Sequence, residues 1–195
     1  PALDYVVTKM PRFPFDKFAD ADNALSTQMK ATGETMSIGR TVEESLLKAI
    51  RSLEIGLYHL YSPKFEGQSE EELLDFIKIG TDDRIYAIAA LLRLGCRIEK
   101  ITAASGIDKF FIRKLKNIVA EETGLRENPG SIPELYRAKR MGFADKTIGK
   151  LWNMKETDVF ELRKSKGIVP VYKMIDTCAS EFESYIPYFY STYEE

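Results

Sequence analysis

Histidine and cysteine, the residues that most often bind zinc or serve in nucleophilic catalysis, are scarce in this chain of 195 residues. His59 is the single histidine, and the two cysteines, Cys96 and Cys178, lie far apart without a C-x-x-C spacing. A structural zinc site needs about four such ligands close together, so the sequence predicts no metal centre. A serine or cysteine nucleophile would have only His59 as its base, and the motif G-x-S-x-G is absent. We expect His59 to be an ordinary loop or packing residue and the chain alone to perform no chemistry.

Long apolar runs are also missing. No run approaches the roughly 20 residues that span a bilayer, and the opening PALDYVVTKM lacks the features of a signal peptide. The net charge of −2 gives no general attraction to nucleic acid or to anionic membranes. These features predict a cytoplasmic protein with reduced cysteines and with no membrane or nucleic-acid partner. Because the chain starts without Met and ends at STYEE, we expect a segment of a longer protein.

The stretch KATGETMSIGR, residues 30–40, contains two glycines and raises the question of a phosphate-binding loop. Such loops use consecutive backbone N–H groups at a helix N-terminus, often with a lysine nearby. Gly33 and Gly39 are six residues apart, and Glu34 follows the first glycine, where its charge repels phosphate. Neither G-x-x-x-x-G-K-[ST] nor G-x-G-x-x-G occurs in the chain. The sequence therefore predicts a loop with a different role.

The first third of the chain mixes strand and helix signals. Residues 3–13 are rich in β-forming side chains and predict a short strand that Pro11 ends, because proline lacks the N–H group that a central strand needs. An aromatic, turn-rich loop follows. Residues 24–31 predict a short helix that ends at Gly33.

A stronger helix signal begins at residue 41. Thr41 is a preferred N-cap residue, and Glu44 three positions later completes the pattern of a capping box. Apolar residues at three- and four-residue spacing then continue to Leu53, and Gly56 is the expected stop. The following stretch YSPKFEGQS, residues 61–69, is predicted to be a linker or loop.

Beyond this linker, helical segments follow one another, most of them ended by glycine, and strand signals are nearly absent up to residue 167. Ser69 and Glu72 form a second capping-box pattern at the start of the first segment. The predicted helical segments are 69–80, 81–95, 97–106, 108–124, 132–142, 144–153 and 155–167. The sequence predicts a mainly α fold, in which a domain of short helices follows a small α+β segment.

The helical region also contains a weak internal repeat. Residues 93–118 align at an offset of 47 with residues 140–165 of the stretch 140–167, which pairs Gly95 with Gly142 and Leu115 with Leu162. Each copy reads as a helix, a glycine, a short helix, a turn and a longer helix. This is the outline of a helix-turn-helix, so a nucleic-acid-binding protein is the alternative interpretation.

The charge of the second copy argues against that alternative. Residues 140–167 hold seven lysines and arginines against four acidic residues, a balance of +3. A DNA-binding surface normally carries a denser basic face, because its affinity depends largely on neutralising phosphates. Short helical hairpins are also a common way to build a helical domain.

Several longer motifs resemble the large chain of carbamoyl-phosphate synthetase. The stretch MKATGETMSIGRTVEESLLKA resembles the family segment M-K-S-x-G-E-V-M-x-I-G-R-T-x-x-E-S-x-x-K-A, with Ala31 and Thr35 in place of the usual serine and valine. DYVVTKMPRF resembles the preceding strand, and RMGFADKTIGKL a segment of the middle of the family chain. IDTCASEF and YFYSTYEE resemble the junction that leads to the second half. The resemblance is close at both ends of the chain and looser in the middle.

The resemblance implies a domain plan. The family's large chain has two ATP-grasp halves with a helical oligomerisation domain between them. On that plan, residues 1–54 are the C-terminal part of the first, carboxyphosphate-synthetic half. Residues 55–195 are the oligomerisation domain and its connection to the carbamoyl-phosphate-synthetic half. The parent enzyme would make carbamoyl phosphate from two ATP, bicarbonate and glutamine-derived ammonia for arginine and pyrimidine biosynthesis.

The resemblance also implies which residues matter. Glu34 falls on the acidic position that lines the family's internal carbamate tunnel, whereas the alternative is a carboxylate that only accepts hydrogen bonds from the loop. Independently of the resemblance, Gly33 and Gly39 would let the loop turn and approach its neighbours, and Arg40 would hold it through a charged hydrogen bond. The family's residues for ATP and for Mg²⁺ or Mn²⁺, with K⁺ as a further candidate, lie outside this chain, so we expect no catalytic, cofactor-binding or metal-binding residue here. The partner implied for the full-length enzyme is the glutamine amidotransferase small subunit.

Self-association through the helical domain is the last expectation from the resemblance. Two aromatic-rich stretches, GLYHLYSPKF and YIPYFYSTY, offer material for such a surface, because aromatic residues are enriched at the centres of interfaces. The alternative is that these aromatic side chains pack within one chain. A symmetric dimer is the expected assembly, since closed two-fold assemblies are the commonest.

Overall fold

The computed structural model describes residues 3–13, 15, 17–18, 20–179, 181–183 and 187–194. Within these residues the fold is mainly α, with a small α+β portion at the start, as the sequence predicts. The elements are β1 (Val6–Arg12), β2 (Gly33–Gly39), α1 (Val42–Ser52), the 3-10 helix η1 (Pro63–Phe65), α2 (Glu70–Phe76), α3 (Arg84–Arg93), α4 (Ile98–Ser105), α5 (Lys109–Glu127), α6 (Ile132–Met141), α7 (Asp145–Trp152), α8 (Glu156–Ser165), β3 (Val171–Met174) and β4 (Phe189–Thr192).

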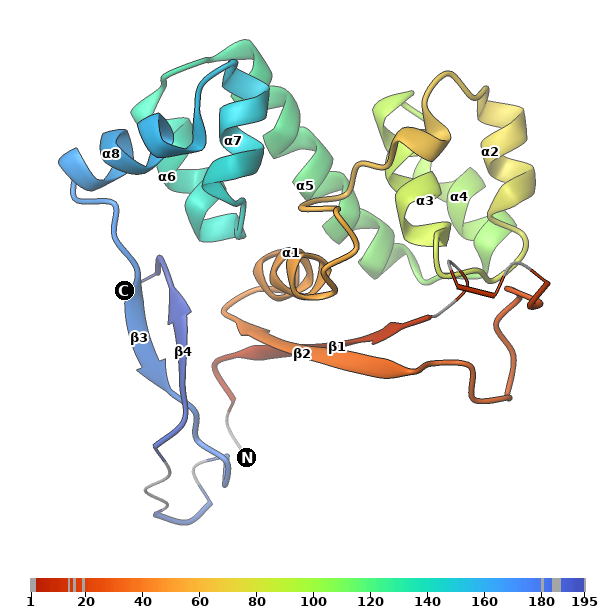
Figure 1. Cartoon of the computed structure of the whole chain (residues 1–195), viewed down its shortest axis with the longest axis horizontal. Helices are drawn as coiled ribbons and strands as arrows, with labels where there is room; N and C mark the ends of the chain where they lie inside the picture. Colours follow the sequence, from red (N-terminus) through yellow and green to blue (C-terminus); the bar gives the residue numbers. More distant parts are fainter. Residues whose placement is uncertain are drawn as a thin grey trace.

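The helices form two groups that α5 connects (Figure 1). Helices α2, α3 and α4 lie around one end of α5, and α6, α7 and α8 lie around the other. Helix α1 lies beneath α5 and covers the β1–β2 hairpin, and the β3–β4 hairpin lies beside the end of that sheet. One apolar cluster runs through both groups, and α1 contributes Leu47 and Ile50, which are fully buried. The hydrophobic core therefore joins α1 to the helical region.

The stretch with the two glycines is a strand, so its prediction as a loop was wrong. β2 pairs antiparallel with β1 along its whole length, from Val6 opposite Gly39 to Arg12 opposite Gly33. The backbone pairing partner lies more than 20 residues upstream, which explains why local turn signals were misleading. β1 also continues through Pro11 to Arg12, which a proline tolerates because every strand of a two-stranded sheet has a free edge.

The short helix predicted over residues 24–31 is absent, and the chain there is irregular. Local side-chain hydrogen bonds replace the helical ones: the Ala24 N–H donates to Asp22, and the Lys30 ammonium donates to the carbonyl groups of Asp22 and Ala24. The Leu25 N–H donates to the carbonyl oxygen of Gly80 at 2.6 Å. Asp, Asn and Ser side chains commonly compete with helix formation in this way.

The helix starts predicted from capping patterns are correct at both strong sites. Thr41 accepts a hydrogen bond from the Glu44 N–H at the start of α1, and Ser69 and Glu72 form a complete capping box at α2. The full capping box predicted at α1 is absent, because the Glu44 carboxylate accepts a hydrogen bond from the N–H of Arg40 instead of from the N–H of the N-cap residue Thr41. Helix α5 also runs past the expected stop at Gly124 to Glu127, where buried Leu125 anchors the extra turn.

The internal repeat is present in the backbone. At the offset of 47 residues, α4 (Ile98–Ser105) coincides with α7 (Asp145–Trp152), and α5 and α8 begin at equivalent positions. Gly95 and Gly142 precede α4 and α7 with φ of 79° and 97°, values that glycine adopts without steric cost. The chain therefore holds two copies of one helical pattern, the first formed by α3, α4 and the start of α5 and the second by α6, α7 and α8.

The β3–β4 hairpin was not predicted. Its strands are four residues long and pair from Val171 opposite Thr192 to Met174 opposite Phe189. Strands this short give little periodicity to read, and their pairing partners are separated by a long connection.

Candidate functional site

Glu34, the residue expected to line a tunnel, lies on the open face of the β1–β2 sheet. Its carboxylate forms an ion pair with Lys9 at 2.9 Å, and the two side chains are 57% and 64% exposed. Exposed Val7 and Met36 share this face, since residues that alternate along a strand point to the same side. The opposite face of the sheet packs against α1. Within the described residues, Glu34 therefore lies on an uncovered surface.

The two glycines at the ends of β2 differ in how closely they approach other atoms. A side chain at Gly33 would meet nothing within 4 Å. A Cβ atom at Gly39 would lie 2.9 Å from the backbone nitrogen of Ser45 and 3.0 Å from Glu44 Cβ. Gly39 lets the end of β2 lie directly against α1, and Gly33 has no such constraint.

Arg40 connects β2 to two distant parts of the chain. Its guanidinium donates to the carbonyl oxygen of Asp4 at 2.6 Å and forms an ion pair with the Asp4 carboxylate. The proximity of Tyr190 and of Asp4 raises the pKa of Arg40. The side chain is thus bound to the segment before β1 and lies close to Tyr190 of strand β4.

Sequence reasoning missed the group that joins β2, α1 and β4, which we name the α1 junction: Arg40, Glu44, Lys48, Ser191 and Thr192. The Glu44 carboxylate, 1% exposed, accepts from the Arg40 N–H at 2.7 Å and from the Thr192 hydroxyl at 3.2 Å. Its other oxygen lies 2.8 Å from the Lys48 ammonium, which also donates to the carbonyl oxygens of Ile38 and Ser191. The sequence predicts only a capping role for Glu44, because Thr192 is 148 residues away.

A second buried ionic cluster lies between α6, α7 and α8. The Asp145 carboxylate, 11% exposed, pairs with Lys139 at 2.7 Å and with Arg163 at 2.8 Å. Burial lowers the pKa of Lys139 to about 8, and the charge of Asp145 opposes that shift. The ring of Tyr193 lies against both cations. This cluster joins the second helix group to Tyr193 near the end of the chain. In the sequence alone, its charged residues look like exposed charges on the surfaces of helices.

His59 packs beside a third ionic cluster. Its ring stacks on Tyr61 with centroids 5.9 Å apart, and its Nε2 lies 3.9 Å from a carboxylate oxygen of Glu122. Burial lowers the pKa of His59 to about 4, so the ring is neutral at pH 7. Burial opposes ionisation of Glu122, yet hydrogen bonds from Arg93 and Arg126 lower the pKa of that carboxyl. These contacts assign His59 to packing.

The described residues contain no group of three or more His, Cys, Asp or Glu side chains placed to hold a metal ion. No helix in this part of the chain is long and apolar enough to cross a membrane. The buried ionic clusters each tie separate elements together, and their charges pair with one another. Such an arrangement stabilises the packing of the helices, and the class that the fold defines is a helical domain.

The comparison with known families agrees with this class. The family model described as carbamoyl-phosphate synthetase large chain, oligomerisation domain, matches residues 34–167. This chain belongs to that family, as the sequence motifs predict. The matched range starts in β2 and extends to the end of the helical region, so α1 is part of it. The boundary between residues 54 and 55 stays a prediction.

Proposed function

We propose that this chain is a structural, oligomer-forming segment of a glutamine-hydrolysing carbamoyl-phosphate synthetase. The family match over residues 34–167 carries the proposal. The parent enzyme would use two ATP, bicarbonate and ammonia released from glutamine by a small amidotransferase subunit. Its product would serve arginine and pyrimidine biosynthesis in the cytoplasm. ATP and Mg²⁺ or Mn²⁺, with K⁺ as a further candidate, would bind to other parts of the large chain.

The surface of the chain supports a role in assembly. By the pairing register, Tyr172, Met174 and Phe189 share one face of the β3–β4 hairpin, and they are 72%, 43% and 56% exposed. Large exposed apolar patches commonly mark interfaces. The stretch GLYHLYSPKF contributes less than the sequence suggests, because Phe65 is buried against Phe76. Of the stretch YIPYFYSTY, Tyr185 and Ile186 lie outside the described residues.

Glu34 is proposed to line the carbamate tunnel of the assembled large chain. The position rests on the resemblance, and its exposure on an open sheet face supports the proposal. A carboxylate on such a face is available to a passage whose opposite wall comes from another part of the enzyme. Lys9, its ion-pair partner, would then lie beside the same passage.

The alternative function, a helix-turn-helix nucleic-acid-binding protein, has weaker support. Helices α7 and α8 do form a compact pair. However, Arg163 is buried against Asp145 and Arg140 pairs with Glu194, so neither adds to an unpaired basic face. Nucleic-acid affinity depends on exposed cations that neutralise phosphates. The family match favours the structural role.

The proposal predicts that the chain alone does not bind Mg-ATP. Tight binding of Mg-ATP needs phosphate-binding donors and metal ligands, and the described residues hold no group of three or more His, Cys, Asp or Glu side chains that could bind the metal. In an isothermal titration, we expect no saturable heat up to ATP concentrations of about 1 mM. The full-length large chain, titrated under the same conditions, is the positive control. A dissociation constant in the micromolar range for the 195-residue chain would contradict the proposal and favour an independent enzyme.

A further inference from the structure

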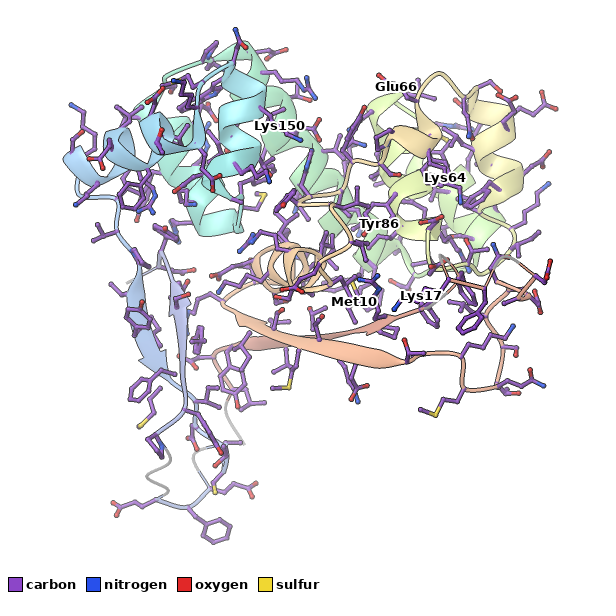
Figure 2. The ribbon with its side chains drawn as sticks, in the orientation of Figure 1. Met10, Lys17, Lys64, Glu66, Tyr86 and Lys150 are labelled. Atoms are coloured by element: carbon purple, nitrogen blue, oxygen red, sulfur yellow. The ribbon has the colours of Figure 1, made fainter. Side chains whose placement is uncertain are left out.

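A cavity lies between the β1–α1 unit and the first helix group. Figure 2 shows Met10 of β1 and Tyr86 of α3 on the two sides of the boundary between these two parts of the fold. The cavity has a volume of about 450 Å³, and its walls come from β1, α1, α3, α5 and the loop after β1. Ligand sites in proteins commonly measure about 300–1,000 Å³ and often lie where two units meet. The size and place of this cavity therefore suit a small molecule.

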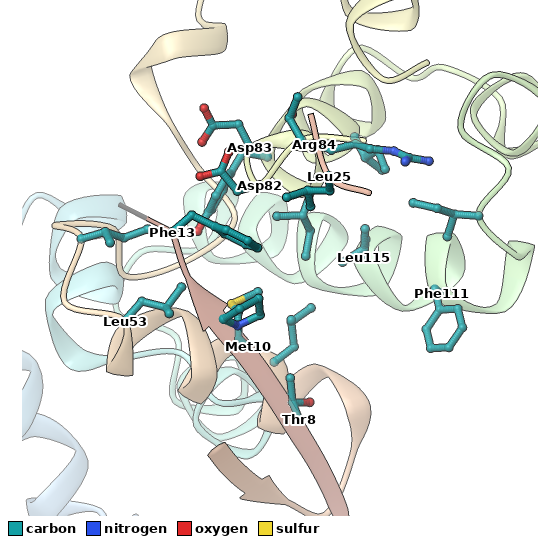
Figure 3. Close-up of a pocket in the computed structure, with 18 of the residues that line it drawn as sticks. Thr8, Met10, Phe13, Leu25, Leu53, Asp82, Asp83, Arg84, Phe111 and Leu115 are labelled. Atoms are coloured by element: carbon teal, nitrogen blue, oxygen red, sulfur yellow. The ribbon is translucent and has the colours of Figure 1, made fainter. Parts of the chain in front are cut away.

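Most of the cavity wall is apolar. β1 contributes Met10, α1 contributes Leu46, α3 contributes Ile85, and α5 contributes Leu115. Figure 3 shows Leu25 and Phe13, both from the loop region, facing the same space. A molecule that fills this volume needs an apolar body, because polar groups would lose their hydration without gaining partners.

One end of the cavity is acidic. Figure 3 places Asp82 and Asp83 above Phe13 and Met10. Asp83 pairs with Lys64, whereas Asp82 has no cationic partner within ion-pair distance in the described chain. Burial and the charge of Asp83 raise the pKa of Asp82, while backbone hydrogen bonds and the charge of Lys64 act in the opposite direction. The hydroxyl oxygen of Thr81 is buried beside it and has no hydrogen-bond partner among the described residues.

The cations that line the cavity are engaged elsewhere. Arg84 donates to the carbonyl oxygen of Ser105, and Lys114 lies 3.4 Å from a carboxylate oxygen of Glu43. Arg12 donates to the carbonyl oxygen of Leu53 at 2.8 Å. Of the two acidic wall residues, Asp82 is therefore the one without an ion-pair partner in the described chain, and an ammonium group would supply one.

We propose that this cavity binds a small amphipathic amine, with its ammonium group at Asp82 and Thr81 and its apolar body between Met10, Leu46 and Leu115. The ligand would contact the β1–α1 unit and the helix group at once and would hold the two together. This binding site is independent of the assembly role proposed above, because the residues that line it come from one chain. It needs neither a second copy nor another subunit.

The test is a titration of the ¹⁵N-labelled chain at pH 7 with 2-phenylethylamine, 2-phenylethanol and phenylacetate, which match in size and differ in charge. We expect saturable shifts of the Asp82, Tyr86 and Leu115 amide signals with the amine. The amine should bind about 10-fold more tightly than the alcohol, and the acid should bind most weakly. Equal affinity for the three compounds, or shifts that do not saturate, would overturn the proposal.

Three variants sharpen the test. Asp82→Asn should reduce amine affinity about 10-fold, to the level of the alcohol, while alcohol affinity stays the same. Asp75→Asn removes an exposed carboxylate of α2 that pairs with Lys78 outside the cavity, and it should change nothing. In Leu25→Trp, the larger side chain of this lining residue between β1 and β2 should fill the cavity and abolish binding of all three compounds. Leu25 is 40% exposed, so this variant should fold. A preference for the amine that survives Asp82→Asn would refute the assigned contact.

Discussion

Asp145→Asn is expected to lower the free energy of unfolding by about 3–5 kcal/mol. Asp145 is the shared carboxylate of Lys139 and Arg163, whose side chains are 7% and 10% exposed. Asparagine keeps the shape of the side chain but leaves two buried cations without a counter-ion. Removal of one partner from a buried ionic group is much more costly than removal of an exposed pair.

Urea denaturation followed by far-UV circular dichroism measures this loss. Glu161→Gln is the matched control, because it removes one negative charge from an exposed position of α8 that does not belong to the cluster. The control should change stability by less than about 0.5 kcal/mol. A loss below about 1 kcal/mol for Asp145→Asn would mean that the cluster does not hold α6, α7 and α8 together.

Gly142→Ala is expected to cost about 2–5 kcal/mol, the sum of a backbone and a packing penalty. Gly142 has a φ of 97°, which an L-residue rarely adopts. A Cβ atom there would lie 3.0 Å from both the Cα and the carbonyl oxygen of Glu44. Because these are backbone atoms of α1, the clash can be relieved only if α1 and the turn after α6 move apart.

Gly130→Ala separates the two penalties. Gly130 has a similar φ of 78°, and a side chain there would meet nothing within 4 Å. It should cost about 1–2 kcal/mol, the backbone penalty alone. Thermal or urea unfolding of both variants gives the difference. Equal losses for the two variants would show that the contact between Gly142 and α1 is looser than described.

Local sequence signals predicted the helical region well. The caps at Thr41 and Ser69 each satisfy backbone groups within three residues, so the pattern and the contact coincide. The repeat could be read because Gly95 and Gly142 occupy equivalent backbone positions that favour glycine. These features depend on neighbours in the chain, and a single sequence contains them.

The parts that sequence reasoning missed depend on distant residues. β2 forms because β1 supplies its hydrogen-bond partners, and residues 24–31 stay irregular partly because Leu25 is tied to Gly80. The residues of the candidate site also fall into those that a sequence motif predicts and those that only distant contacts define. Glu34 was found through a motif, whereas the contact of Glu44 with Thr192 spans 148 residues and leaves no local pattern. Buried charges such as Lys139 and Arg163 look like exposed helix charges until the fold brings Asp145 between them.

Sedimentation equilibrium over a wide range of concentrations tests the central claim, that the chain is an oligomer-forming helical segment. We expect a closed dimer of twice the chain mass of 22.2 kDa, with an interface that buries on the order of 1,200 Å² or more. As the protein concentration increases, the average molecular mass should rise to the mass of the dimer and then remain constant. A monomer that persists at about 100 µM would contradict the claim. A mass that keeps growing with concentration would also contradict it, because it would indicate non-specific association through exposed apolar surface.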